Sequence, residues 1–273
     1  MYRSKILEVA DMISRAFSTL NRNLGLVLVP VLMDLASFAL GMMTVGFWGQ
    51  SKLSLKLALN VGLPSISAIL EQNVLAGEIT LGLDGAGPAA ATFLLAILFL
   101  FLSAFVEAGF VGLLYEVAGE KAPSLDSFVS YGKRFWLRFL GLRLLVFAFS
   151  IIGILMAMLL SIIGLFAYMI IFIVLRVRYI YWEYTMLSED LNVFDAFRRS
   201  RVLFDGRAPE LSSIIIAILL ANFLVALIIN LAWTPVTLLL FIPIYGYVAS
   251  ALQMALMMNK LELNVESPLP VEE

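Results

Sequence analysis

Near its C-terminal end this chain has 49 consecutive residues, from Leu211 to Asn259, without one charged side chain. A helix of about 20 apolar residues crosses the roughly 30 Å hydrocarbon core of a bilayer, so this stretch can hold two crossings and a turn. Trp233, Thr234 and Pro235 lie in its middle, where a turn is expected. Because lipid offers the backbone no hydrogen-bond partners, the crossings should be helices. The sequence therefore predicts an all-α, polytopic integral membrane protein.

The composition argues against several classes of function. Hydrophobic residues make up 62% of the chain and charged residues 14%, the latter about half the share in soluble proteins. The net charge of −2 gives no reason to expect a nucleic-acid partner. The chain has no cysteine and no histidine, so it lacks thiolate nucleophiles and the commonest general base and transition-metal ligand. We expect no catalytic residues, no cofactor site and no metal site, and hence no enzyme.

Other charge-free windows predict the remaining crossings. The first crossing is Leu24 to Trp48, interrupted by Asp34, and the second begins with Gly85 to Val106. The window from Leu144 to Leu175 is too long for one crossing and has arginines on both flanks. A hairpin with its turn near Ser161 to Gly164 is therefore favoured over a single tilted helix. Together with the two C-terminal crossings, six transmembrane helices are expected.

The basic residues predict the orientation. Sixteen of the 18 lysines and arginines lie in the N-terminal segment, in the later loops and their flanks, or after the last helix, and the exceptions are Lys52 and Lys56. Because cytoplasmic loops carry an excess of lysine and arginine, this side is assigned to the cytoplasm. Both termini are then inside, and the loop from Gly49 to Pro88 is outside.

Three amphipathic stretches share one apolar spacing of i, i+3, i+4, i+7 and i+11. They cover Ile6 to Leu20, Leu125 to Phe139 and Val193 to Phe204, each with charged residues on the opposite face. Such helices can lie in the membrane interface, with aromatic residues toward the acyl chains and basic residues toward anionic lipid head groups. Ordinary cytoplasmic connector helices packed under the bundle would show the same pattern. Both readings place three amphipathic helices on the cytoplasmic side.

The repeated pattern suggests one membrane domain over residues 1–260. It divides into three units, 1–115, 116–186 and 187–260, each an amphipathic helix followed by membrane helices. Residues 261–273 contain two prolines and four glutamates, which is typical of a disordered tail.

The predicted outer loop has features of its own. Apolar and polar residues alternate over residues 53–60 and 79–84, and this period of two predicts a small two-stranded hairpin. Between these segments, Ser65 is placed to cap a short helix that bears Ile66, Ile69, Leu70 and Val74.

One segment carries a family resemblance. The acidic run from Leu187 to Asn192, the segment Asp195-Ala196-Phe197-Arg198-Arg199-Ser200 and the hairpin after Pro209 resemble multi-pass prokaryotic membrane families of unassigned function. These include the membrane domain fused to some glycerophosphoryl diester phosphodiesterases. The chain departs from them at Arg201, where many members carry tryptophan. The resemblance implies this architecture and a prokaryotic cytoplasmic membrane, but no activity.

Four charged residues stand out because charges within lipid need a partner or a task. Asp34, Glu107, Arg143 and Arg176 come from four different predicted helices and fall at similar depth in the cytoplasmic half. We expect at least one carboxylate–guanidinium contact, between Glu107 or Asp34 and Arg143 or Arg176. The cluster is either a structural network that holds the helices in register or a proton or ion relay built on Asp34 and Glu107.

Other polar residues have simpler expected roles. Asn222, Asn230 and Gln253 are expected to form interhelical hydrogen bonds. Arg178 and Glu183 are expected to reach the membrane interface along their aliphatic stems.

Two functions fit these observations. The first is a non-enzymatic membrane module that binds lipid or a membrane-protein partner through its amphipathic belt, either as a homo-oligomer or within a larger complex. The alternative is a small transporter or channel built on the charge cluster. A cavity that reaches Asp34 and Glu107 would favour transport, whereas a closed ion pair would favour a structural role.

Overall fold

The computed structural model describes residues 2–44, 46–53, 59–70 and 89–266, and these ranges contain helices and irregular chain but no strand. The α-helices are α1 (Tyr2–Arg22), α2 (Leu28–Thr44), α3 (Ala89–Ala118), α4 (Leu125–Arg178), α5 (Trp182–Ser188), α6 (Val193–Leu231) and α7 (Pro235–Glu266). Two short 3₁₀ helices, η1 (Leu24–Leu26) and η2 (Ile66–Ile69), complete the set. The described residues include five helices long and apolar enough to cross a membrane. For the described residues, the prediction of an all-α chain with helices long and apolar enough to span a membrane is confirmed.

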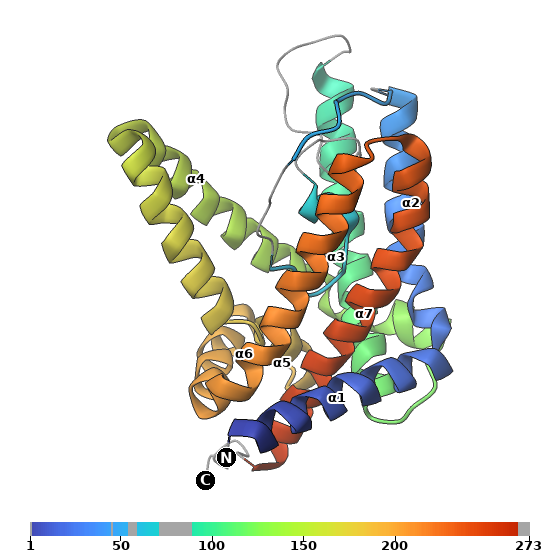
Figure 1. The fold of residues 1–273 in the computed structure, drawn as a ribbon, viewed down its shortest axis with the longest axis vertical. Helices are drawn as coiled ribbons and strands as arrows, with labels where there is room; N and C mark the ends of the chain where they lie inside the picture. Colours follow the sequence, from blue (N-terminus) through green and yellow to red (C-terminus); the bar gives the residue numbers. More distant parts are fainter. Residues whose placement is uncertain (1, 45, 54–58, 71–88, 267–273) are drawn as a thin grey trace.

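Helices α2, α3, α6 and α7 form an upright bundle, and α1 lies across one end of it (Figure 1). The face that α1 turns toward the bundle carries Val9, Met12, Ala16 and Leu20, all buried. Their spacing of three and four residues is the helical period expected from the sequence. The first amphipathic stretch is therefore a separate helix that packs against α6 and α7.

The second and third amphipathic stretches differ from the prediction because no break separates them from the apolar segments that follow. Residues 125–143 are the first part of α4, and residues 193–207 are the first part of α6. Both starts are capped: the side chain of Ser124 accepts a hydrogen bond from the N–H of Ser127, and that of Asn192 accepts two from backbone N–H groups. The second and third amphipathic stretches thus each form one continuous helix with the apolar segment that follows.

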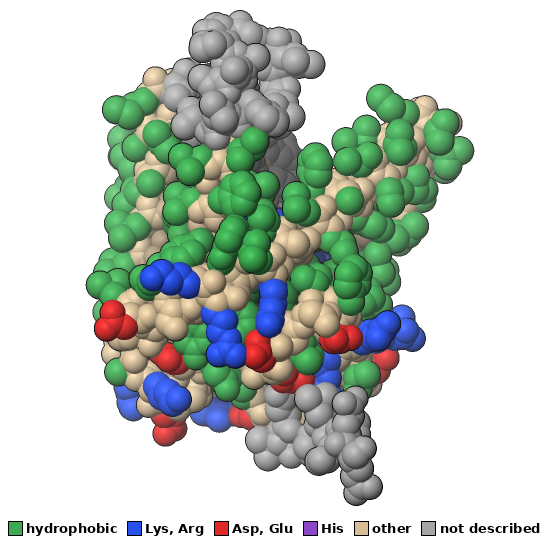
Figure 2. All heavy atoms as spheres, turned by 180° about the vertical axis from the view of Figure 1, so that it is seen from behind, with side chains coloured by type: hydrophobic (Ala, Val, Ile, Leu, Met, Phe, Trp, Pro, Cys, Tyr) green, Lys and Arg blue, Asp and Glu red, His purple; other side chains and the backbone are tan. Residues whose placement is uncertain are grey.

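Helix α4 reverses direction at Ser161, where the backbone is non-helical (φ 54°, ψ −139°). This position lies within the predicted turn. The two limbs, here called the α4 hairpin, contact each other where the ring of Tyr168 lies against Gly153 and packs with Phe149. Only 6% of the most apolar stretch of this span is buried. Figure 2 shows the hairpin standing apart from the bundle, covered with apolar side chains, while charged side chains gather near the α1 end.

Close approach of α3 and the first part of α4 depends on glycines. A Cβ atom at Gly109 or Gly112 would collide with the rings of Phe128 and Tyr131. A Cβ atom at Gly132 would collide in the same way with Phe105. Small residues at such positions let membrane helices pack closely, and they fix the base of the α4 hairpin against α3.

Residues 59–70, here called the inserted segment, belong to the loop predicted on the outer side of the membrane, and in the structure they lie among the helices. Their backbone runs between α2, α4 and α7, where Arg176 and Gln253 donate hydrogen bonds to it. Ser65 caps η2 by accepting a hydrogen bond from the N–H of Ser67, as the sequence predicted, and the structure shows that Ile66 and Ile69 are buried. Most of the proposed two-stranded hairpin, and Val74, fall on residues 54–58 and 71–88, outside the described residues.

The predicted disordered tail is wrong for residues 261–266, because α7 continues to Glu266. Leu263 is buried and Leu261 packs against the core, while Glu262 pairs with Arg15 of α1 at 3.3 Å. These contacts stabilise the last turns of the helix. Residues 267–273 lie outside the described part of the chain.

Candidate functional site

A cavity of about 830 Å³ lies between the α4 hairpin, α2, α3, α5 and the inserted segment. Its volume falls within the usual range for small-molecule sites, about 300–1,000 Å³. Apolar side chains form much of its wall, among them Leu100, Leu145, Val146, Phe149, Phe172 and Ile173. Charged side chains line the base, where the two limbs of the hairpin meet the bundle. Asp34, Glu107, Arg143 and Arg176, singled out from the sequence, all line this one cavity.

Glu107 and Arg143 form the expected carboxylate–guanidinium contact. The Nε and Nη2 groups of Arg143 donate to Oε2 of Glu107 at 2.9 and 2.6 Å. The Nη1 group donates to the hydroxyl of Ser103 at 2.5 Å. Since Glu107 and Ser103 are both on α3, this pair fixes the first limb of the hairpin to α3 at the base of the cavity.

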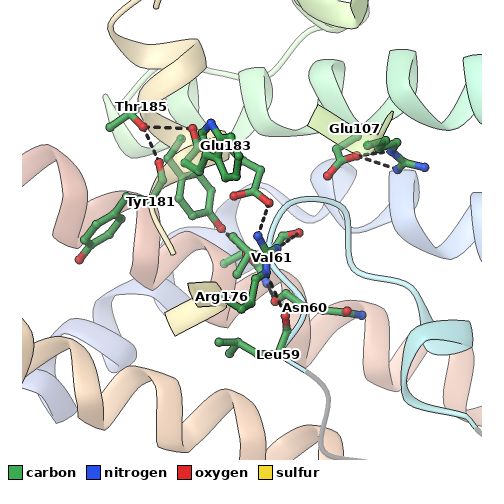
Figure 3. A network of polar contacts seen from close by, with 12 residues as sticks. Leu59, Asn60, Val61, Glu107, Arg176, Tyr181, Glu183 and Thr185 are labelled. Carbon is green, nitrogen blue, oxygen red and sulfur yellow. Dashed lines mark hydrogen bonds and ion pairs between the residues drawn. The ribbon is translucent and has the colours of Figure 1, made fainter. Parts of the chain in front are cut away.

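Arg176 pairs with Glu183, a residue that was expected to reach the membrane interface. Their atoms Nη1 and Oε1 lie 2.8 Å apart, and Glu183 is almost fully buried. Arg176 also donates to the carbonyls of Leu59 and Val61 in the inserted segment, at 3.4 Å each (Figure 3). The snorkelling prediction for Glu183 is wrong because the chain turns back after α4, and α5 then carries this carboxylate under the bundle.

Asp34 is held by the inserted segment instead of by an arginine. Its carboxylate accepts a hydrogen bond from the hydroxyl of Ser65 at 2.6 Å and another from the N–H of Ile66 at 2.8 Å. Within the described residues no cation forms an ion pair with it. The four predicted residues thus share one cavity but form separate contacts, and only Glu107 and Arg143 pair with each other.

Gly62 shows how tightly the inserted segment passes over this charged base. Its φ is +88°, and an added Cβ atom would meet the carboxylate of Glu107. We expect Gly62→Ala to lower the thermal unfolding midpoint in detergent, because left-handed backbone costs about 1–2 kcal/mol and the collision adds to that. Gly46→Ala is the matched control, since φ there is +80° and nothing lies near its Cβ position. Equal losses for the two variants would contradict this close packing.

A second charged cluster, here called the buried triad, consists of Glu189, Arg199 and Lys260. The two oxygens of Glu189 lie 2.8 Å from Nζ of Lys260 and 3.0 Å from Nε of Arg199. Lys260 is fully buried and also contacts the hydroxyl of Ser188. The triad ties α7 to the loop between α5 and α6. The sequence interpretation had treated Lys260 only as a topology marker.

Asp190 joins the same loop to the amphipathic part of α4. It accepts hydrogen bonds from Arg134 at 2.5 Å and from Arg138 at 2.7 Å. The Arg138 guanidinium, with help from Arg134, holds the pKa of this exposed carboxyl below its usual value. Its contribution to stability is therefore present above the ordinary aspartate pKa and is lost as the pH falls through the lowered value. The two adjacent acidic residues of the motif, Glu189 and Asp190, thus link the loop between α5 and α6 to different helices: Glu189 to α6 and α7, and Asp190 to α4.

Of the polar residues on α6 and α7, Gln253 forms hydrogen bonds to other segments, whereas the Asn230 side chain bonds within its own helix. Gln253 donates to the carbonyl of Asn60 at 2.8 Å and accepts a hydrogen bond from the hydroxyl of Tyr184, which confirms its interhelical role. The side-chain amide of Asn230 instead donates to the carbonyl of Ala226 in its own helix, at 2.9 Å. Gln253 therefore holds the inserted segment from α7, as Asp34 does from α2.

No protein-family model, curated protein or solved structure matches this chain. The described residues contain no group of three or more acidic side chains placed to hold a metal ion. What the site offers chemically is an apolar space with fixed charges at one end.

Proposed function

We propose that this chain is a non-enzymatic integral membrane protein that binds a lipid in the cavity beside the α4 hairpin. The observation that carries the proposal is the division of the cavity into apolar walls and a charged base. An amphiphile matches this division, because its chain can cover the walls while its polar group reaches the base. The protein would then be a lipid-binding module, acting alone, as a homo-oligomer or as a subunit of a larger membrane complex.

The proposal includes six crossings in the cytoplasmic membrane of a prokaryote, with both termini inside. The reversal at Ser161 supports counting the two limbs of α4 separately, and the distribution of basic residues supports the orientation. The amphipathic segments would then face anionic lipid head groups. Single cysteines in this cysteine-free chain test the orientation: Ser51→Cys should react with an impermeant thiol reagent from outside and Ala122→Cys only from inside. The reverse pattern would reject it.

Blocking the cavity should remove the bound lipid. Val146 lines the cavity, so Val146→Trp places a bulky ring in the space proposed for an acyl chain. We expect native mass spectrometry of the protein, released from mild detergent, to show a lipid-bound wild type and a several-fold smaller bound fraction for the variant. Leu155→Trp is the matched control, because Leu155 is exposed on the same hairpin but does not line the cavity. Equal lipid retention by both variants would overturn the proposal.

A second candidate function is transport along a relay that includes Asp34 and Glu107. The observation in its favour is that Asp34 lines the cavity without an ion-pair partner among the described residues. The closed pair between Glu107 and Arg143 speaks against it. Transport predicts pH-dependent ion flux in proteoliposomes that Asp34→Asn abolishes while the fold is kept. Wild-type liposomes without such flux would eliminate this candidate.

A further inference from the structure

The charged groups at the base of the cavity are not equally accessible. The side chains of Arg143 and Arg176 are 32% and 20% exposed, whereas those of their partners Glu107 and Glu183 are 9% and 4% exposed. In both ion pairs the carboxylate is the deeper group and the guanidinium is the more accessible one. A ligand that enters the cavity therefore meets the cationic member of each pair first.

Both guanidinium groups keep hydrogen-bonding capacity. Arg143 contacts Glu107 and Ser103, and Arg176 contacts Glu183 and two backbone carbonyls. A guanidinium carries more N–H bonds than these contacts use. The remaining carboxylate, Asp34, already accepts hydrogen bonds from the inserted segment. Among the residues that line the cavity, the cationic donors left for a ligand thus belong to the two arginines.

We propose that the lipid bound in this cavity is an anionic phospholipid whose phosphate is held by Arg143 and Arg176, a proposal that rests on the lipid-binding function above. Arginine suits this role because its planar fork binds phosphate oxygens through parallel hydrogen bonds. An acyl chain extends along the hairpin, against the cavity wall that the stacked rings of Phe149 and Phe172 help to form. A free phosphate would leave these apolar walls uncovered. The cation of a zwitterionic head group would lie beside two guanidinium groups, which repel it.

Trp182 lines the same cavity and is a natural reporter. The full-length protein in detergent is titrated with phosphatidylglycerol or phosphatidylcholine brominated on the acyl chains, which quench nearby tryptophan. The Trp182 signal is the difference between wild type and Trp182→Phe. We expect brominated phosphatidylglycerol to quench this signal at a several-fold lower concentration than phosphatidylcholine, with no effect of added inorganic phosphate.

Variants separate the cavity from general attraction of anionic lipid to the basic face. The double variant Glu107→Gln with Arg143→Gln removes one ion pair without leaving a lone charge, and should lose much of the preference for phosphatidylglycerol. Arg143→Lys keeps the charge and loses the fork, so a smaller loss is expected if the double variant does not fold. Arg178→Gln is the matched control, because Arg178 pairs with Asp205 and does not line the cavity; its preference should match wild type.

Each contrary result has a separate meaning. Equal quenching by the two lipids would overturn the anionic head group while leaving lipid binding intact. Loss of the preference in Arg178→Gln to the same degree as in the cavity variants would also overturn it. Displacement of brominated phosphatidylglycerol by inorganic phosphate would assign the site to a free anion. Absence of Trp182 quenching by either lipid would overturn the proposed function itself.

Discussion

Glu189→Gln is expected to lower the free energy of unfolding by about 3–5 kcal/mol, the range found when one partner of a buried ion pair is removed. The reason is that Glu189 is the shared anion of the buried triad, within 3.0 Å of both Arg199 and Lys260. Lys260 is fully buried, so the variant leaves a cation with little access to water or to an anion. Unfolding by dodecyl sulfate in mixed micelles, followed by circular dichroism, measures the change.

The neighbouring acid provides a matched control. Asp190 also contacts two cations, but its side chain is 47% exposed, and those of Arg134 and Arg138 are 62% and 33% exposed. Exposed salt bridges contribute no more than about 1 kcal/mol, so Asp190→Asn should have a small effect. A loss for Asp190→Asn as large as that for Glu189→Gln would show that burial of the triad does not control stability at this end.

Arg143→Gln is expected to destabilise the protein more than the double variant Arg143→Gln with Glu107→Gln. The single change leaves the buried Glu107 carboxylate beside the inserted segment without its cation, at a cost of about 3–5 kcal/mol. The double change removes both charges and leaves neutral side chains that can still form hydrogen bonds. Glu107→Gln alone should cost less than Arg143→Gln, because Arg143 is the more accessible partner.

The same dodecyl sulfate titrations give the coupling energy of the pair through the cycle of two single variants and the double variant. Additive losses would mean that the contact between Glu107 and Arg143 contributes nothing specific. In that case the base of the cavity would owe its shape to helix packing alone.

Much of the fold follows from local sequence patterns. Charge-free windows such as Leu211 to Asn259 predict helices, because a charged residue within lipid is costly. The turn at Ser161 was predicted because the window around it is too long for one crossing and has arginines at both ends. The cap at Ser65 depends on only a few neighbouring residues. In each case the deciding interactions lie within one segment of the chain.

The parts that sequence reasoning missed depend on contacts between distant segments. The inserted segment looks like an ordinary outer loop, and only Arg176, Gln253 and Asp34, from three separate helices, supply the hydrogen bonds that let it lie inside the bundle. Buried backbone needs such partners, and no periodicity reveals them.

The candidate site shows the same division. The sequence predicted that Asp34, Glu107, Arg143 and Arg176 lie at similar depth along their helices, and in the structure all four line one cavity. Which of these residues form ion pairs with each other could not be predicted, because Arg176 pairs with Glu183 on α5. The poor packing of the α4 hairpin, which opens the cavity, also leaves no mark in its uniformly apolar sequence.

We propose that a lipid occupies the cavity between the α4 hairpin and the bundle. The most direct test is a high-resolution density map of the full chain in nanodiscs that contain phosphatidylglycerol and phosphatidylcholine. We expect elongated density along the wall formed by Phe149 and Phe172, ending in a head group at Arg143 and Arg176. A map in which the hairpin closes onto α3 and fills the cavity, or in which the cavity holds only water, would contradict it.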